Sequence, residues 1–232
     1  MENTMWTSQP MVGFDTETTG VDPTVERLVT ASIIVVDSNG VTRHYWLADP
    51  GVEIPLQAQN VHGISTEQAR REGEPVTKVL NEVADLLCHH MAAGHPIVAF
   101  NAAYDLTLME CELERHGLTT MAERLGHEVG PVIDPYILDR TVDRYRRGKR
   151  RLENLADHYD VAADDSFHNA EADVLATLRV LGAMLRRYPE LAEDSLAHLM
   201  TLQQQTYTEF QQYMASRHGQ HITGPLPWPV TK

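Results

Sequence analysis

The pattern that most constrains the fold is an apolar run followed by a β-hairpin near the start of the chain. Leu28 to Val36 is rich in valine and isoleucine, and Asn39-Gly40 follows as a tight turn because both residues tolerate positive φ. Val41 to Leu47 then returns as a further strand. Together with the apolar segment Met11 to Phe14, these stretches predict three antiparallel strands.

Helical and strand patterns alternate after the hairpin. Residues 76–87 place apolar side chains on one helical face. Ile97 to Phe100 and Val132-Ile133 are short apolar runs suited to buried strands, and a helix is expected directly after the first of them. Further helices are expected from about Tyr136, Leu152 and Ala170. This alternation predicts an α/β fold with a mixed sheet flanked by helices.

The composition changes from Pro189 onward. A polar, glutamine-rich helix is expected over Thr201 to Tyr213, and the final stretch HGQHITGPLPWPVTK contains three prolines and Trp228. We therefore expect residues 1–187 to form the main domain and residues 188–232 to form a C-terminal helix with a Pro-rich tail. Prolines favour extended structure, so the tail is either a strap folded on the domain or a mobile recognition segment.

Acidic residues accompany the predicted core elements at three places. Asp15 and Glu17 end the first strand and project to the same side, because successive strand side chains alternate between faces. Asp105 falls in the first turn of the helix expected directly after Ile97 to Phe100, where the helix dipole favours a carboxylate. His168 and Asp173 lie five residues apart at the start of a later helix.

Each acid alone could be an ordinary strand-edge or helix-start residue, but together they predict a metal site. Four carboxylates converging in one cleft would repel one another and raise their own pKa values unless cations held them. Oxygen ligands without cysteine favour Mg²⁺ or Mn²⁺ over structural zinc. Convergence of these acids would therefore imply a bound divalent metal.

The segments FDTETTG, NAAYD and HNAEAD, in this order, resemble the three exonuclease motifs of the DnaQ-like family in its DEDDh branch. That branch includes the proofreading epsilon subunit of bacterial DNA polymerase III. The resemblance covers residues 10 to 185, and the later segments are similar to stand-alone exonucleases of actinobacterial type. It implies an RNase H-like fold, with a five-stranded mixed sheet here, and a 3′–5′ exonuclease that uses two Mg²⁺ or Mn²⁺ ions. The product would be a nucleoside 5′-monophosphate.

The resemblance also assigns expected roles to individual residues. Asp15, Glu17, Asp105 and Asp173 match the metal-binding acids of the family, and His168 matches its general base. The weaker candidates for substrate contact are Thr16, Thr18, His62, Asn101, Tyr104, Arg147, Lys149 and Arg150.

Four of the weaker candidates also have an ordinary structural explanation. Thr16 could offer its backbone to the terminal 3′ hydroxyl, or simply continue the strand. Tyr104 could press against the terminal sugar or base, or belong to the core. His62 matches a position that borders the family's active site, but a loop histidine is often a capping or surface residue. Asn101 could orient the site through its amide or serve a turn.

The charge distribution contains one strong local exception. The chain has 19 basic and 33 acidic residues, a formal charge of −14, which argues against a protein that coats nucleic acid. Arg140 to Arg151 reads RTVDRYRRGKRR and holds seven basic residues with one acid. This run is a candidate phosphate contact, with a solvated helix face as the alternative.

Partner and location signals are weaker. Gln205 to Phe210, QTYTEF, faintly resembles a clamp-binding peptide but lacks the aliphatic residue before its phenylalanine, so a polymerase or clamp partner stays open without support. The sequence lacks a secretory signal and any apolar stretch near the roughly 20 residues of a membrane helix. We therefore expect a cytoplasmic protein without a membrane partner, in which Cys88 and Cys111 are packed thiols.

Single-stranded or frayed DNA is the favoured substrate from sequence, and no motif decides the sugar. An exoribonuclease of the same family is the closest alternative, because recognition of a 2′ hydroxyl depends on contacts that the sequence does not expose. A non-catalytic nucleic-acid-binding adaptor is more distant, because no motif acid is missing. An unrelated metal-dependent phosphoesterase would need histidine ligands near the acids.

Overall fold

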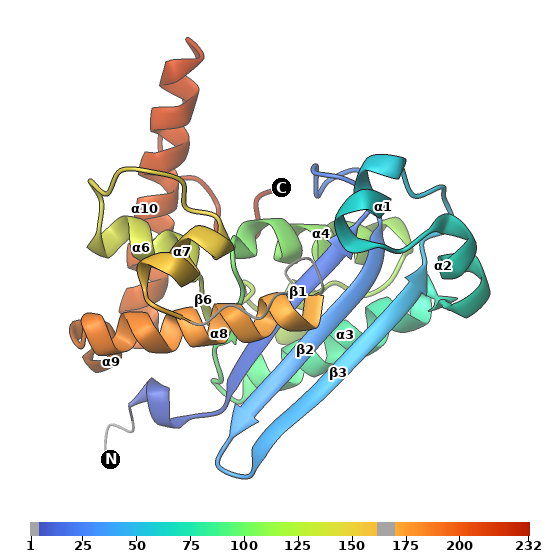
Figure 1. Cartoon of the computed structure of the whole chain (residues 1–232), viewed down its shortest axis with the longest axis horizontal. Helices are drawn as coiled ribbons and strands as arrows, with labels where there is room; N and C mark the ends of the chain where they lie inside the picture. The colour runs from blue at the N-terminus through green and yellow to red at the C-terminus, as the bar shows by residue number, and fades with distance from the viewer. Residues whose placement is uncertain (1–4, 162–169) are drawn as a thin grey trace.

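The computed structural model describes residues 5–161 and 170–232, which are organised around a mixed sheet (Figure 1). The strands of this sheet are β1 (Met11–Thr18), β2 (Leu28–Asp37), β3 (Gly40–Asp49), β4 (Glu74–Pro75), β5 (Ile97–Val98) and β6 (Val132–Ile133). Their order is β4-β3-β2-β1-β5-β6. Strands β1 to β3 are antiparallel, and β5 and β6 run parallel to β1. The predicted α/β fold with antiparallel and then parallel strands is confirmed.

The short strand β4 makes this a sheet of six strands, where five were expected. β4 is the dipeptide Glu74–Pro75, which pairs in parallel with the end of β3. Two residues carry no hydrophobic periodicity, and a proline is tolerated at a sheet edge because its missing N–H is not needed there. The sequence pattern therefore had no feature from which to predict it.

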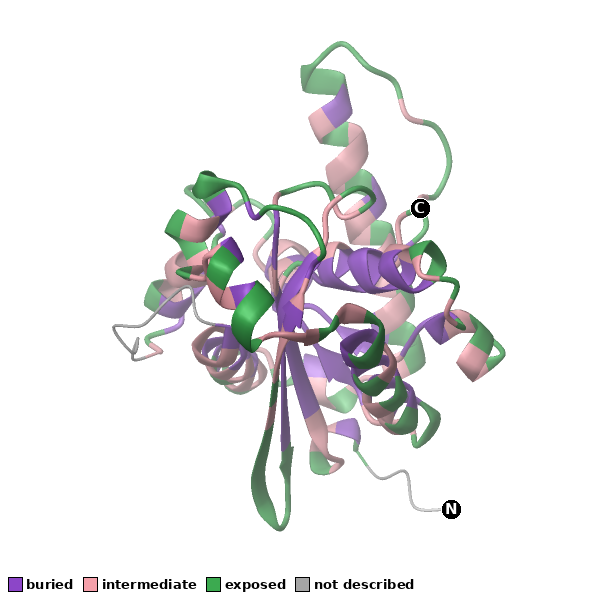
Figure 2. Ribbon diagram, turned by 90° about the vertical axis from the view of Figure 1, so that its right-hand side faces the viewer, coloured by how far each residue is buried: buried purple, intermediate pink, exposed green. Residues whose placement is uncertain are grey.

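Helices cover both faces of the sheet. They are α1 (Leu56–His62), α2 (Thr66–Glu72), α3 (Val76–Ala92), α4 (Ala102–Arg115), α5 (Met121–Leu125), α6 (Pro135–Val142), α7 (Leu152–His158), α8 (Ala170–Arg187), α9 (Glu190–Glu193) and α10 (Leu196–Arg217), with a 3-10 turn η1 at Trp6–Ser8. Helix α8 packs along β1 and β2, whereas α3 and α4 lie on the opposite face (Figure 1). Buried residues are concentrated on the strands and on the helix faces turned toward them (Figure 2).

The carboxyl ends of the parallel strands β1, β5 and β6 meet at one edge of the sheet. Asp134, which follows β6 and is fully buried, binds the backbone at this edge. Its Oδ1 accepts hydrogen bonds from the N–H groups of Asn101 (3.0 Å) and Tyr136 (2.9 Å), and its Oδ2 accepts one from Ala102 (3.0 Å). Helix starts leave such N–H groups without intrahelical partners, so this carboxylate fixes the first turns of both α4 and α6.

The C-terminal segment packs against the same edge. Gln203 of α10 is fully buried, accepts a hydrogen bond from the Asp134 N–H (2.7 Å) and donates one to the Val132 carbonyl (3.0 Å). Beyond α10 the tail returns to the body, where Trp228 is buried and the Thr231 N–H donates to Thr107 Oγ1 at 2.8 Å. The tail is therefore a strap on the domain, while the division between residues 187 and 188 stays a prediction.

Two expectations from composition concern the cysteines and the membrane. Cys88 is buried, Cys111 is half-buried, and both are free thiols. Within residues 5–161 and 170–232, no helix combines the length and the apolarity that crossing a bilayer requires.

Close packing at Gly13 brings α8 onto β1. A Cβ atom at this position would lie 2.4 Å from Val174 Cγ1 and 3.0 Å from Leu178 Cδ1. The 2.4 Å contact is far shorter than carbon atoms adopt in a packed interior, and the 3.0 Å contact is tight. Glycine at position 13 therefore permits the approach of the helix that carries Asp173.

We expect Gly13→Ala to lower the free energy of unfolding by about 1–3 kcal/mol, because the new methyl group overpacks the interface. The matched control is Gly182→Ala on α8, where a Cβ would meet only Arg186 Nη1 at 3.6 Å. This control should be neutral or stabilising by up to about 1 kcal/mol, because alanine is the better helix former. Urea unfolding measures both changes, and equal stability of the two variants would contradict the packing argument.

Candidate active site

Three carboxylates meet where α8 crosses β1. Asp15 and Glu17 alternate along β1 on the face that α8 covers, and Asp173 lies in the first turn of α8. One carboxylate oxygen from each lies within 4.8 Å of the others. The start of α8 is also tied to β3 by an ion pair between Arg43 Nε and Glu171 Oε1 (2.8 Å). The structure thus brings together acids that are more than 150 residues apart in the sequence.

Asp105 approaches this cluster from the opposite layer. It lies in the first turn of α4 and is 4% exposed. Its Oδ1 accepts two hydrogen bonds from Thr16, one from the backbone N–H (3.0 Å) and one from Oγ1 (2.6 Å). Because Thr16 stands between Asp15 and Glu17, these bonds hold Asp105 beside the acid pair. They also occupy the Thr16 N–H, so a backbone contact of Thr16 with substrate would have to use another atom.

The electrostatics of the cluster favour a bound cation. Burial, together with Asp105, Glu17 and Asp173, holds the pKa of Asp15 well above its usual range. Burial raises the pKa of Glu17 to about 8, with Asp173 and Asp105 adding to the effect. Burial also raises the pKa of Asp105 to about 7, although the hydrogen bonds from Thr16 act in the opposite direction.

This donor set fits a hard divalent ion. A cation among the carboxylates would offset their repulsion and favour their ionised forms. Carboxylate oxygens in an all-oxygen site suit Mg²⁺ and Mn²⁺. Asp15, Glu17 and Asp173 are the residues that could hold the metal, with Asp105 adjacent.

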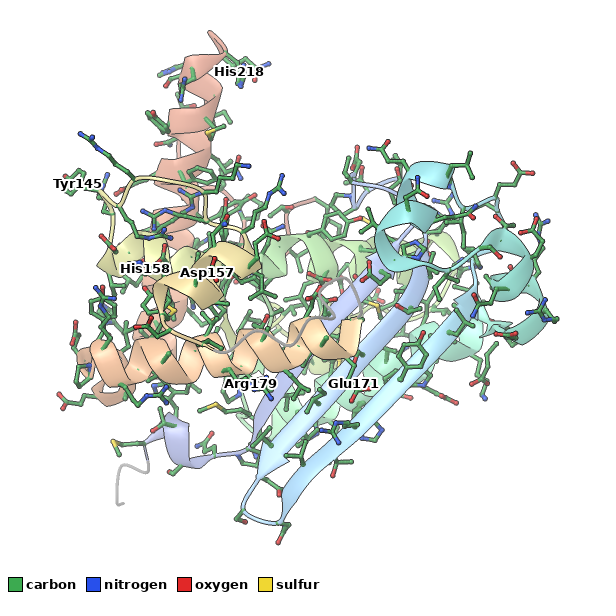
Figure 3. All side chains as sticks on the ribbon, viewed as in Figure 1. Tyr145, Asp157, His158, Glu171, Arg179 and His218 are labelled. Carbon is green, nitrogen blue, oxygen red and sulfur yellow. The ribbon has the colours of Figure 1, made fainter. Side chains whose placement is uncertain are left out.

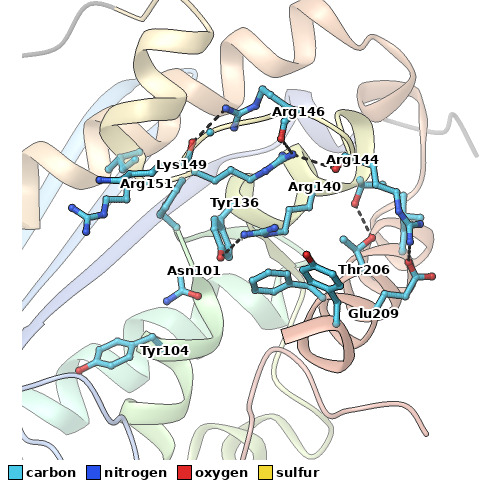
Figure 4. Close-up of a pocket in the computed structure, with 18 of the residues that line it drawn as sticks. Asn101, Tyr104, Tyr136, Arg140, Arg144, Arg146, Lys149, Arg151, Thr206 and Glu209 are labelled. Atoms are coloured by element: carbon cyan, nitrogen blue, oxygen red, sulfur yellow. Dashed lines mark hydrogen bonds and ion pairs between the residues drawn. The ribbon is translucent and has the colours of Figure 1, made fainter. Parts of the chain in front are cut away.

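The side chains of Tyr104 and Thr18 are hydrogen-bonded to each other near the end of β1. The Tyr104 hydroxyl lies 2.6 Å from Thr18 Oγ1 and donates to the Gly20 carbonyl (2.5 Å), to which Thr18 Oγ1 also donates (2.8 Å). Burial raises the pKa of Tyr104 to about 12, so the phenol stays protonated at neutral pH. These bonds fix the loop after β1 to α4, while the Tyr104 ring lines a large cleft (Figure 4).

Asn101 and His62 occupy different sides of the cluster. Asn101 is exposed, lines the same cleft as Tyr104 and has a left-handed backbone conformation (φ 60°) before α4 (Figure 4). His62 ends α1 and lines a separate cavity of about 270 Å³ together with Glu17. Its Nδ1 accepts the Ile64 N–H (3.1 Å), and burial lowers its pKa. His168 lies outside the described residues.

The large cleft extends from the acids to the C-terminal helix. Its volume is about 1300 Å³, and its lining begins at Asp15, Thr16 and Asp105. It continues over α6 and the segment of residues 143–151 to α10. The cleft therefore joins the candidate metal site to the basic run noted in the sequence.

Members of the basic run have different roles. Arg146 Nη2 lies 2.8 Å from Asp139 Oδ2, and Arg150 is paired with the same buried carboxylate. Arg150 is 8% exposed and also donates to the Asp143 carbonyl (2.6 Å). Its contacts indicate a structural role in the 143–151 segment, and a substrate contact for it stays a prediction.

Arg144, Arg147 and Lys149 are exposed. Arg144 Nη2 pairs with Glu209 Oε2 of α10 at 2.8 Å (Figure 4). Lys149 lines the cleft, and Arg147 is not among its lining residues. Within the part of the chain that the structure describes, neither has a carboxylate at ion-pair distance.

Sequence reasoning missed an aromatic and cationic group on the far wall of the cleft. The guanidinium carbon of Arg140 lies 4.6 Å from the ring centroid of Tyr136 and 3.6 Å from that of Phe210, and Arg140 Nη2 donates to the Tyr136 hydroxyl (2.8 Å). The spacing of Tyr136 and Arg140, four residues apart in a predicted helix, was the available signal. Phe210, in the segment that resembles a clamp-binding peptide, packs against this arginine within α10.

Comparison with known proteins identifies the family. The family model of RNase T, described as an exonuclease, matches residues 12–181. The DNA polymerase III PolC-type of Streptococcus thermophilus is 29% identical over 172 residues, which are 73% of this chain and 11% of that protein. The PolC-type polymerase of Streptococcus agalactiae is also 29% identical, over 181 residues. The chain thus matches a small part of each of these relatives.

Solved structures with the same fold include E. coli exonuclease I. Its complex with a dT13 oligonucleotide has a TM-score of 0.63 and 20% sequence identity, covering 79% of this chain and 42% of that one. A complex with a dA16 oligonucleotide has a TM-score of 0.66 and the same identity. The match to the exonuclease model spans the strands and helices that carry the acids, and we conclude that the chain belongs to the RNase T exonuclease family, a member of the DnaQ-like exonucleases.

Proposed function

We propose that this protein is a metal-dependent 3′–5′ exonuclease that releases nucleoside 5′-monophosphates from single-stranded or frayed DNA. The observation that carries the proposal is the cluster of Asp15, Glu17 and Asp173 at one end of a cleft lined with cationic and aromatic side chains. Family membership supports phosphodiester hydrolysis as the reaction. The proposed location is the cytoplasm.

The clustered acids would hold the metal ions at the reacting phosphate. Asp15, Glu17 and Asp173 would hold the ions, and Thr16 would keep Asp105 in reach through its two hydrogen bonds. Bound Mg²⁺ or Mn²⁺, as a pair of ions, would lower the pKa of the attacking water and neutralise the leaving oxygen.

His168 is the proposed general base. It would accept a proton as the water oxygen bonds to phosphorus and the bond from phosphorus to the 3′ oxygen breaks. A base of this kind typically contributes about 10² to 10⁴ in rate.

DNA is favoured over RNA by the similar proteins. The matched relatives are DNA polymerases, and E. coli exonuclease I was solved with DNA oligonucleotides. A polymerase partner in trans stays an open prediction. RNA cleavage is the alternative result of the test described next.

The direct test is gel-resolved digestion of matched 5′-labelled single-stranded DNA and RNA oligonucleotides with Mg²⁺ or Mn²⁺. We expect a ladder that shortens from the 3′ end on DNA and requires metal. A ladder on RNA alone would replace the proposal with an exoribonuclease. No cleavage of either strand would leave a non-catalytic adaptor.

Replacing Asp173 with Asn should remove nearly all activity, because one of the three clustered carboxylates loses its charge. The matched control is Glu171→Gln, which changes an acid two residues away that pairs with Arg43 instead. His168→Ala should slow turnover by about 10² or more if this residue is the base. Wild-type turnover in the His168 variant would refute that role, and circular dichroism would check that each variant is folded.

Metal should stabilise the protein more at high pH than at low pH. Glu17 and Asp105 have pKa values raised to about 8 and about 7, so the metal-free fold loses stability as pH rises from about 4, where the unfolded carboxyls ionise, toward 8. Saturating Mn²⁺ should raise Tm by about 5–10 °C at pH 8 and by less at pH 5. Differential scanning fluorimetry with EDTA as control measures this, and equal shifts at both pH values would contradict the electrostatic argument.

A further inference from the structure

One wall of the cleft is formed partly by α10, which lies outside the region matched by the exonuclease family. We call it the α10 wall, and it consists of Tyr136, Arg140, Tyr145, Lys149, Phe210 and Tyr213. Phe210 and Tyr213 belong to α10, which follows the matched residues 12–181. We propose that the α10 wall binds the single-stranded nucleotides upstream of the scissile phosphate. The inference rests on the proposed nuclease function and adds to it a second binding surface for the same strand.

Two aromatic rings on this wall are largely exposed. Tyr145 is 89% exposed and Tyr213 is 57% exposed, yet both line the cleft. Figure 3 shows Tyr145 projecting from the 143–151 segment. Exposed aromatic faces suit unpaired bases, because every base offers a ring for stacking.

Deeper in the cleft, a cation already lies over aromatic rings. The Arg140 guanidinium carbon lies over both Tyr136 and Phe210, at 4.6 Å and 3.6 Å from their ring centroids. Phe100 continues the row, with its ring centroid 5.6 Å from that of Tyr136. An unpaired base could extend this row, because it stacks on rings and on guanidinium planes alike.

The charges of the wall fit a phosphate backbone. Among the described residues, Arg140 and Lys149 line the cleft without a carboxylate at ion-pair distance. Arg144 is paired with Glu209, whose negative charge would repel phosphates near that point (Figure 4). The protein as a whole has a net charge of −14 and would repel nucleic acid. Two cations without carboxylate partners in the cleft would attract an anionic strand locally.

The position of the wall decides which substrates reach it. The same cleft begins at Asp15 and Asp105, so a strand held at the acids by its 3′ end can continue along it. A dinucleotide would reach only the acids, whereas a longer strand would also reach the wall. Duplex DNA keeps its bases stacked on one another, which leaves them unavailable to these rings.

The test compares kcat/KM for a single-stranded DNA of about ten nucleotides with kcat/KM for a dinucleotide. The wild-type protein should prefer the longer substrate, and Phe210→Ala or Tyr145→Ala should reduce that preference about tenfold, because stacking on one ring is lost. Tyr145 is largely exposed, so its substitution leaves the core intact. Leu56→Ala, which removes another exposed apolar side chain away from the cleft, should retain the preference.

Lys149→Ala tests the phosphate contact separately. It should lower the slope of log Kd against log salt concentration by about 0.7, the value for one phosphate on a single strand. Lys78→Ala, on α3, is the matched control and should leave the slope unchanged.

The outcomes separate the two proposals. Hydrolysis of both substrates with an unchanged length preference in the Tyr145 and Phe210 variants would overturn the α10 wall and leave the nuclease function intact. Hydrolysis of neither substrate by the wild-type protein would refute the nuclease function itself. Equal kcat/KM of the wild-type protein for the two substrates would also contradict nucleotide binding by the α10 wall.

Discussion

Asp134 binds the first N–H groups of two helices at once, and the geometry of the candidate site depends on these bonds. Its buried carboxylate holds the starts of α4 and α6 at the edge where β1, β5 and β6 end. Helix α4 carries Asp105 and Tyr104 to the acids, and α6 carries Tyr136 and Arg140 to the cleft. Both helix starts share this one acceptor, so a single residue orients α4 and α6 relative to each other.

The acid cluster is held together by packing and hydrogen bonds that act against charge repulsion. Gly13 permits α8 to approach β1, which brings Asp173 within reach of Asp15 and Glu17. Thr16 holds Asp105 from the opposite layer. The raised pKa values of Asp15, Glu17 and Asp105 are the electrostatic consequence of this arrangement. A preformed cluster of this kind would bind a divalent cation without having to reorganise its ligands.

The basic run shows why a local charge pattern does not identify a binding surface. Arg146 and Arg150 surround the buried Asp139 and build the 143–151 segment, and Arg144 is paired with Glu209. Arg140 and Lys149 also line the cleft, and among the described residues neither has a carboxylate at ion-pair distance. The division follows from burial and from the nearest carboxylate, neither of which appears in a list of charged residues. A cluster of cations can therefore serve folding and ligand binding with different members.

The sequence by itself determined the α/β class, the hairpin at Asn39-Gly40 and the motif acids, because periodicity and turn chemistry are local and the motifs are contiguous. It also indicated the family, which the match over residues 12–181 bears out. Only the tertiary structure decided that Asp134 caps two helices, that Gly13 lies under α8 and that Phe210 stacks on Arg140. The contacts of Asp134 with α4, of Gly13 with α8 and of Phe210 with Arg140 join elements far apart in the chain, and long-range partners are selected by the packing of the whole core rather than by neighbouring residues.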